Sequence, residues 1–147
     1  MRRSIGAVIL GYVVMAAAVF VTFTLAYLIM GADVDFKPDS YEVSGLWLVA
    51  SLVLGLIAAV MGGLICASVA RGSRAPLALA GLVLVLGLLM AFAGCGASDT
   101  EESQVRSGDV GNFEAMQKAN EPDWMKLINP FIGAVGVLFG SRWRRPA

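Results

Sequence analysis

The stretch SLVLGLIAAVMGGLICASVARGSRAP, residues 51–76, decides the fold that this sequence predicts. Small residues recur in it every four positions and are expected on one helix face: Ser51, Gly55, Ala59, Gly63 and Ala67. Residues of this size let two transmembrane helices approach closely, where backbone packing replaces the hydrophobic drive that is missing in lipid. Two arginines end the apolar run within residues 71–74, and Pro76 suits the first turn of a following helix. We therefore predict a transmembrane hairpin centred on this stretch.

The composition extends this prediction to the whole chain of 147 residues. Hydrophobic residues make up 58% of it and charged residues only 15%, far from the average of a water-soluble domain. Four apolar runs, at about residues 5–30, 44–70, 75–97 and 122–143, are long enough to cross a hydrocarbon core of roughly 30 Å. The predicted fold class is all-α: one polytopic membrane domain, residues 1–147, built as a four-transmembrane-helix bundle.

The formal net charge of zero conceals a separation of charges along the chain. All the acids lie in two hydrophilic segments, residues 33–42 and 98–126. Positive residues in short loops stay on the cytoplasmic side, so both termini and the central turn are expected there. An even number of spans satisfies that arrangement, in agreement with four apolar runs. The arginines outside the acidic segments, which carry this prediction, are Arg2, Arg3, Arg71, Arg74, Arg142, Arg144 and Arg145.

The first acidic segment, residues 33–42, has one alternative interpretation. Its Asp33-x-Asp35 spacing is compatible with calcium, but the glycine and the distal glutamate of an EF-hand are absent. We interpret the segment as a solvated loop on the outer face.

Two other stretches look like processing signals. The first apolar run follows Arg2 and Arg3, but it is too long for a signal peptide and lacks a small-x-small cleavage site, so we expect a retained span. Residues 92–95, Phe-Ala-Gly-Cys, resemble a bacterial lipoprotein cleavage box, with phenylalanine where an aliphatic residue is usual. We expect a helix end there, and no disulfide between Cys66 and Cys95, because the two cysteines lie on opposite sides of the membrane.

The outer segment, residues 98–121, is the longest hydrophilic part of the chain. Asn112 is a suitable helix N-cap, and Phe113 and Met116 share a face of the short amphipathic helix that would follow. Together with Trp124 they are candidate contacts with lipid or with a partner protein. Trp124 and Trp143 stand roughly 28 Å apart along the last helix, the separation of the two aromatic belts of a membrane.

The last span contains a proline and a second small-residue motif. Pro130 should kink the helix, and Gly136 and Gly140 form a small-xxx-small pair for helix packing. A weak internal repeat pairs residues 57–60 with residues 132–135, which leaves duplication of a hairpin open.

The sequence excludes most catalytic chemistry by what it lacks. It has no histidine, the commonest general base and zinc ligand, and the interior of each span has no Asp, Glu, Lys or Arg. Nucleotide-binding and phosphate-binding loops are absent as well. We therefore expect no enzyme, no cofactor, no metal site and no nucleic-acid partner. The hydroxyl groups of the first span, on Tyr12, Thr22, Thr24 and Tyr27, are its polar content.

The segment GGLICASVAR, residues 62–71, and the turn to Pro76 resemble those of the many small, uncharacterised four-span proteins of bacterial inner membranes. The resemblance covers the topology of the chain and implies an inner (cytoplasmic) membrane location, but no activity. Two functions remain open at this point. One is a structural, accessory-subunit or scaffold role, packing on a membrane-protein partner or as a homo-oligomer. The other is a channel or carrier for a small neutral or amphipathic solute.

Overall fold

Four long helices account for most of the structure, a computed structural model that describes residues 2–31, 34, 36–37, 41–70, 74–95 and 121–143. They are α1 (Arg2–Met30), α3 (Gly45–Ala70), α4 (Arg74–Cys95) and α6 (Asp123–Arg142). Each contains a segment long and apolar enough to cross a membrane. A helix satisfies its own backbone hydrogen bonds, so apolar runs of this length are stable in lipid as helices. The predicted all-α, multi-pass membrane fold with four spans is confirmed.

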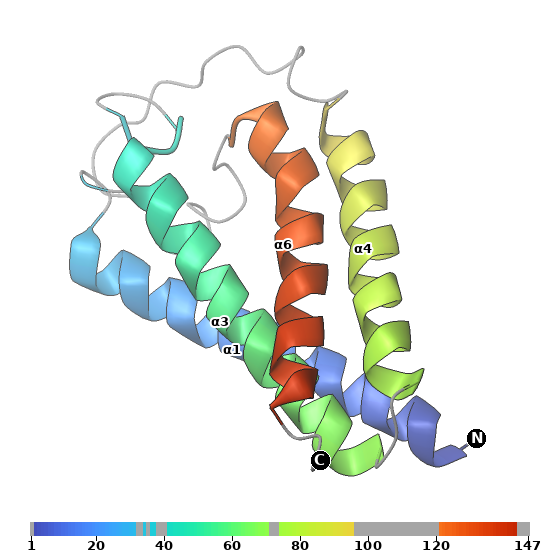
Figure 1. Ribbon diagram of the computed structural model, residues 1–147. Helices are drawn as coiled ribbons and strands as arrows, with labels where there is room; N and C mark the ends of the chain where they lie inside the picture. Colours follow the sequence, from blue (N-terminus) through green and yellow to red (C-terminus); the bar gives the residue numbers. More distant parts are fainter. Residues whose placement is uncertain are drawn as a thin grey trace.

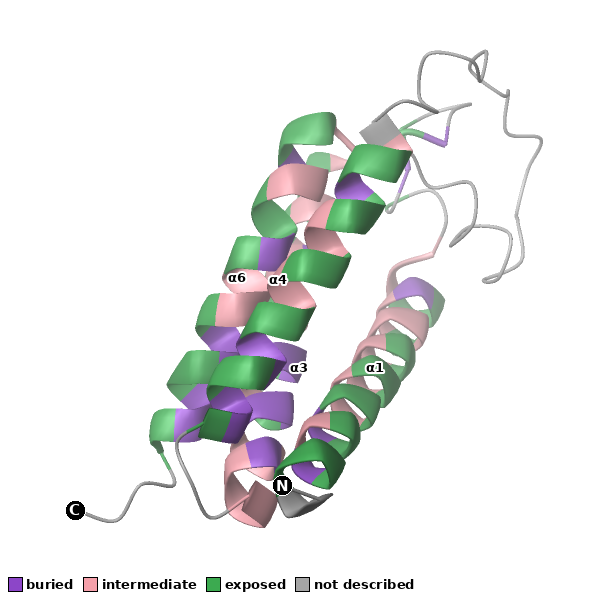
Figure 2. Ribbon diagram, turned by 90° about the vertical axis from the view of Figure 1, so that its right-hand side faces the viewer, coloured by how far each residue is buried: buried purple, intermediate pink, exposed green. Residues whose placement is uncertain are grey.

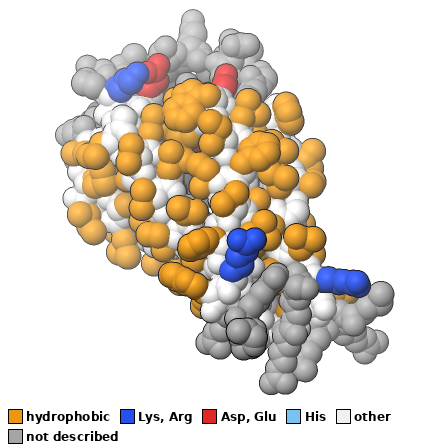
Figure 3. Space-filling model, viewed as in Figure 1, with side chains coloured by type: hydrophobic (Ala, Val, Ile, Leu, Met, Phe, Trp, Pro, Cys, Tyr) orange, Lys and Arg blue, Asp and Glu red, His pale blue; other side chains and the backbone are white. Residues whose placement is uncertain are grey.

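The helices alternate in direction, so that the start of α1, the end of α3, the start of α4 and the end of α6 lie at one end of the bundle (Figure 1). We call this end the basic end, defined by Arg74 and Arg142, and the other the acidic end, defined by Glu42 and Asp123. Hydrophobic side chains cover a broad band of the surface between these two ends (Figure 3). α3 and α6 consequently run parallel to each other, because each descends from the acidic end to the basic end.

The parallel pair α3 and α6 forms the centre of the bundle. α1 packs on α3 and α4 packs on α6, while α1 and α4 touch over a smaller area. The buried positions concentrate on the facing sides of the helices, and the outward sides are exposed (Figure 2). Large apolar side chains on these outward sides, such as Ile29 and Met90 at 82% and 74% exposed, suit contact with lipid.

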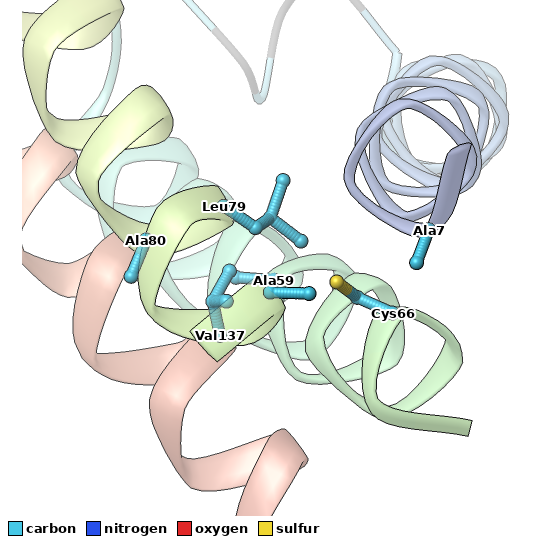
Figure 4. Close-up of a cluster of buried hydrophobic side chains, with 7 residues drawn as sticks. Ala7, Ala59, Cys66, Leu79, Ala80 and Val137 are labelled. Atoms are coloured by element: carbon cyan, nitrogen blue, oxygen red, sulfur yellow. The ribbon is translucent and has the colours of Figure 1, made fainter. Parts of the chain in front are cut away.

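The best-packed part of the bundle lies toward the basic end, where all four helices contribute (Figure 4). Most of its members are small, which draws the helix axes close together, and Leu79 is the largest fully buried side chain. The Cys66 thiol is free and buried there, so it takes part in no disulfide. The cluster consists of Ala7, Ala59, Cys66, Ala75, Leu79, Ala80 and Val137.

A second cluster closes the acidic end between α1 and α3, and it changes the interpretation of the first loop. α1 ends at Met30, and the next residue, Gly31, has a φ of 79° that only glycine adopts readily. Phe36 and Val43 then form an antiparallel bridge and pack with Tyr27 and Trp47. The loop expected to be solvated is therefore anchored by buried apolar side chains, because Phe36 and Val43 are only 4% and 3% exposed.

Ser44 fixes the start of α3 after this loop. Its hydroxyl donates to the Val34 carbonyl at 2.6 Å and accepts from the Trp47 N–H at 3.1 Å, which is the geometry of a helix N-cap. The exposed ion pair of Lys37 and Glu42 spans the same loop at 2.6 Å.

Several predictions concern residues outside the described part of the chain. They are the calcium alternative at Asp33 and Asp35, the amphipathic helix with Phe113 and Met116, and the arginines at 71, 144 and 145.

Candidate functional site

The five small residues of the α3 stripe do not share one environment. Ser51, Ala59 and Gly63 are buried, whereas Gly55 and Ala67 are partly exposed. A helix repeats every 3.6 residues, so each four-residue step turns the stripe by about 40° around the axis. The stripe therefore winds around α3 and cannot face one neighbour along its whole length.

The closest helix contact is the crossing of α3 and α6, at Gly63 and Gly140. A Cβ atom at Gly63 would overlap the Val137 carbonyl oxygen and lie 2.8 Å from the carbonyl carbon and the Cα of Val137. A Cβ atom at Gly140 would meet the backbone of Val60 in the same way, with the Val60 carbonyl carbon at 2.8 Å. Backbone packs directly on backbone here, which only glycine permits.

Gly136 extends this crossing by one turn of α6. A Cβ atom there would lie 2.8 Å from the Cβ of Ala59 and 3.0 Å from Cδ1 of Leu56. Ala59, Gly63, Gly136 and Gly140 from the predicted packing set therefore meet at one place in the structure.

The crossing is symmetric. Gly63 lies against Val137 and Gly140 lies against Val60, and both the two valines and the two glycines are 77 residues apart in the sequence. Trp47 and Trp124 have the same spacing, near the starts of α3 and α6. The internal repeat in the sequence aligns residues 57–60 with residues 132–135, a spacing two residues shorter than the 77 of this contact. Low-complexity apolar segments align equally well at several spacings, which explains the difference.

Two further glycine contacts, which no sequence motif predicts, join the outer helices to the central pair. A Cβ atom at Gly11 of α1 would lie 2.8 Å from the Cβ of Cys66 on α3. A Cβ atom at Gly87 of α4 would lie 2.7 Å from Cβ and Cγ of Pro130. Gly87 thus provides room for the proline ring, and α6 continues as a helix through Pro130. The signal for both was a glycine within an apolar run, where it weakens a helix unless packing requires it.

Gly55 of the stripe lies where α3 and α6 have already diverged. It precedes Gly63 by two turns, roughly 12 Å along the helix. The nearest neighbour of a Cβ atom at Gly55 would be Oδ1 of Asn129, at 3.9 Å. Asn129 itself is exposed on α6. We call this pair, Gly55 and Asn129, the Gly55 recess: a small residue beside an amide group on the surface that the hydrocarbon would cover.

Four hydroxyl groups among the described residues of the spans hydrogen-bond to carbonyl groups of their own helices. Thr22 donates to the Ala18 carbonyl at 2.6 Å, and Ser68 donates to the Leu64 carbonyl at 2.7 Å. Ser51 and Ser141, both buried, likewise donate to the carbonyls three residues earlier, at 3.0 and 2.7 Å. Back-bonding of this kind satisfies the hydroxyl without a solute or water.

The ends of α6 carry its interfacial groups. Trp124 and Trp143 are 52% and 73% exposed, as belt tryptophans would be, whereas Trp47 packs edge-on against Phe23 at 5.8 Å and is buried. Tyr27 also points inward, although its sequence position suits an interfacial aromatic residue.

Charged groups mark the start of α6 at the acidic end. Lys126 pairs with Asp123 at 3.1 Å across the first turn. Burial raises the pKa of Glu121, which precedes the helix, and the positive charge of Lys126 partly opposes that rise in pKa. Among the described residues, no group of three or more His, Cys, Asp or Glu side chains is placed to hold a metal ion.

No protein-family model, curated protein or solved structure matches this chain. The resemblance to small bacterial four-span proteins therefore stays a prediction from topology and from residues 62–76.

Proposed function

We propose that this multi-pass membrane protein has a structural, accessory or scaffold role, and that it packs on a membrane-protein partner or on a second copy of itself. The observation that supports this most is the packing around the α3–α6 crossing. Ala59, Leu79 and Val137 fill the space between the helices there, at 1%, 0% and 0% exposed. A bundle with a filled interior is rigid and can bind other proteins through its outer surface. A solute pathway, in contrast, needs polar groups along an open interior.

The polar groups of the spans support the same choice. A solute pathway would use the hydroxyl groups of the first span, on Tyr12, Thr22, Thr24 and Tyr27, and the hydroxyl of Thr22 already donates to its own helix. The Ser51 and Ser141 hydroxyls are satisfied in the same manner. We infer a location in a bacterial inner membrane with both termini cytoplasmic, supported by the arginines at the basic end.

The Gly55 recess is the proposed contact surface. An exposed amide at membrane depth is unfavourable in lipid, and a second helix that hydrogen-bonds to Asn129 would remove that cost. Gly55 beside it lets the backbone of such a helix come close. Trp124, five residues earlier on α6, points about 140° around the helix axis from Asn129, so it remains a separate candidate contact at the interface.

Affinity purification of the tagged protein from its native membranes tests this proposal. Gly55→Leu and Asn129→Leu should each abolish a stoichiometric partner, or dimerisation if the partner is a second copy. Gly81→Leu on α4 is the matched control, because Gly81 is also exposed and a Cβ atom there would meet nothing within 4 Å. Wild-type levels of partner with all three variants would refute the proposed contact surface. A monomer that purifies alone and conducts a neutral solute in vesicles would refute the structural role.

A further inference from the structure

An open groove runs between the first turns of α1 and α4 at the basic end. Its volume is about 690 Å³, within the range of roughly 300–1,000 Å³ that ligand sites in proteins occupy. The walls are apolar along most of their length, and polar groups lie at the mouth. The lining residues are Ser4, Ile5, Val8, Ile9, Arg74, Ala75, Ala78 and Leu82.

We propose that this groove binds one anionic phospholipid, with an acyl chain along the apolar walls and the phosphate at Arg74. In a membrane, a groove that opens on the side of the bundle is filled by lipid unless a helix covers it. Ile5 and Ile9 of α1 are 60% and 59% exposed, and within the described residues they face the space in which a chain would lie. A flexible chain suits walls of this kind because it adapts to them.

The charge at the mouth selects the headgroup. Arg74 is exposed at the first position of α4, where its guanidinium is available for bidentate hydrogen bonds to a phosphate. Ser4, also at the mouth, supplies a hydroxyl. The groove lies between the N-terminal turns of two helices, whose positive dipole ends favour an anion further. None of the described residues that line the groove is acidic, so none of them opposes this preference. Basic pockets between membrane helices bind anionic headgroups by this combination.

Native mass spectrometry of the detergent-solubilised full chain, titrated with phosphatidylglycerol or phosphatidylcholine of identical acyl chains, tests the proposal. The wild type should bind phosphatidylglycerol more tightly. Arg74→Gln should weaken phosphatidylglycerol binding about fivefold, the effect of one arginine at a membrane surface. It should weaken phosphatidylcholine binding less, because the choline of that lipid offsets the charge of its phosphate. Arg142→Gln is the matched control, because Arg142 is an exposed arginine at the same end of the bundle but outside the groove.

A second pair of variants tests the groove itself. Ala78→Trp fills it and should reduce the binding of both lipids, whereas Ala93→Trp, an exposed alanine at the other end of α4, should not. Thermal unfolding of both tryptophan variants checks that they are folded. Equal losses with Arg74→Gln and Arg142→Gln would overturn the site in favour of a diffuse basic surface. Unchanged lipid binding by the Ala78→Trp variant would refute the groove as the lipid site. If the wild type is a dimer and Ala78→Trp dissociates it, the groove binds a second copy of the protein and not a lipid.

Discussion

Substituting Gly63 by alanine is the sharpest test of the packing between α3 and α6. The added methyl group would overlap the backbone of Val137, with the carbonyl carbon and the Cα both 2.8 Å from the new Cβ. A side chain would move aside, but backbone atoms within a helix move only with the helix. The two helices must therefore separate, which weakens the neighbouring contact of Gly140 with Val60 as well.

The magnitude follows from two opposing effects. Overpacking of a close contact costs about 1–3 kcal/mol, and the upper value applies here because backbone is involved. Replacing glycine by alanine in a helix gains up to about 1 kcal/mol. We expect a net loss of about 2 kcal/mol in the free energy of unfolding, and Gly140→Ala should lose a similar amount. The double variant should lose less than the sum, since the first separation relieves the second clash.

Equilibrium unfolding in mixed detergent micelles, followed by tryptophan fluorescence to which the buried Trp47 contributes, measures these losses. Gly81→Ala is the control, because the same change occurs in α4 where a Cβ atom meets nothing within 4 Å. That variant should be unchanged or slightly more stable. If Gly63→Ala were as stable as Gly81→Ala, the direct packing of backbone on backbone would be refuted.

Two further predictions concern the ends of the bundle. With the native Cys66 and Cys95 replaced by serine, a membrane-impermeant thiol reagent should label Glu42→Cys in intact cells and Trp143→Cys only after lysis, and the reverse pattern would invert the proposed topology. The raised pKa of Glu121 means that the folded protein binds this proton more tightly than the unfolded chain does. The Glu121 carboxyl therefore stabilises most below its ordinary pKa of 4.5, and the stability of the wild type relative to Glu121→Gln should fall as pH rises above that value. A pH-independent difference between the two in thermal unfolding would contradict the burial of this carboxyl.

The sequence by itself determined the number, type and approximate limits of the spans. Lipid offers no hydrogen bonds to the backbone, so an apolar run of this length has one stable form, the helix. The predicted 44–70 and 122–143 correspond to helices Gly45–Ala70 and Asp123–Arg142 for that reason. The small-residue motifs also predicted Gly63, Gly136 and Gly140 as helix-packing positions.

Only the tertiary structure decided which small residues meet. Gly55 and Gly63 belong to one stripe, yet Gly63 lies against the backbone of α6 and Gly55 lies in the recess beside Asn129. Two crossing helices are close only near the crossing point, and its position depends on the packing of the whole bundle. Phe36 and Val43 in the first loop were undetected for a related reason. Phe36 within the acidic segment and Val43 just after it give no periodic signal, and contacts with α1 and α3 are what bury them.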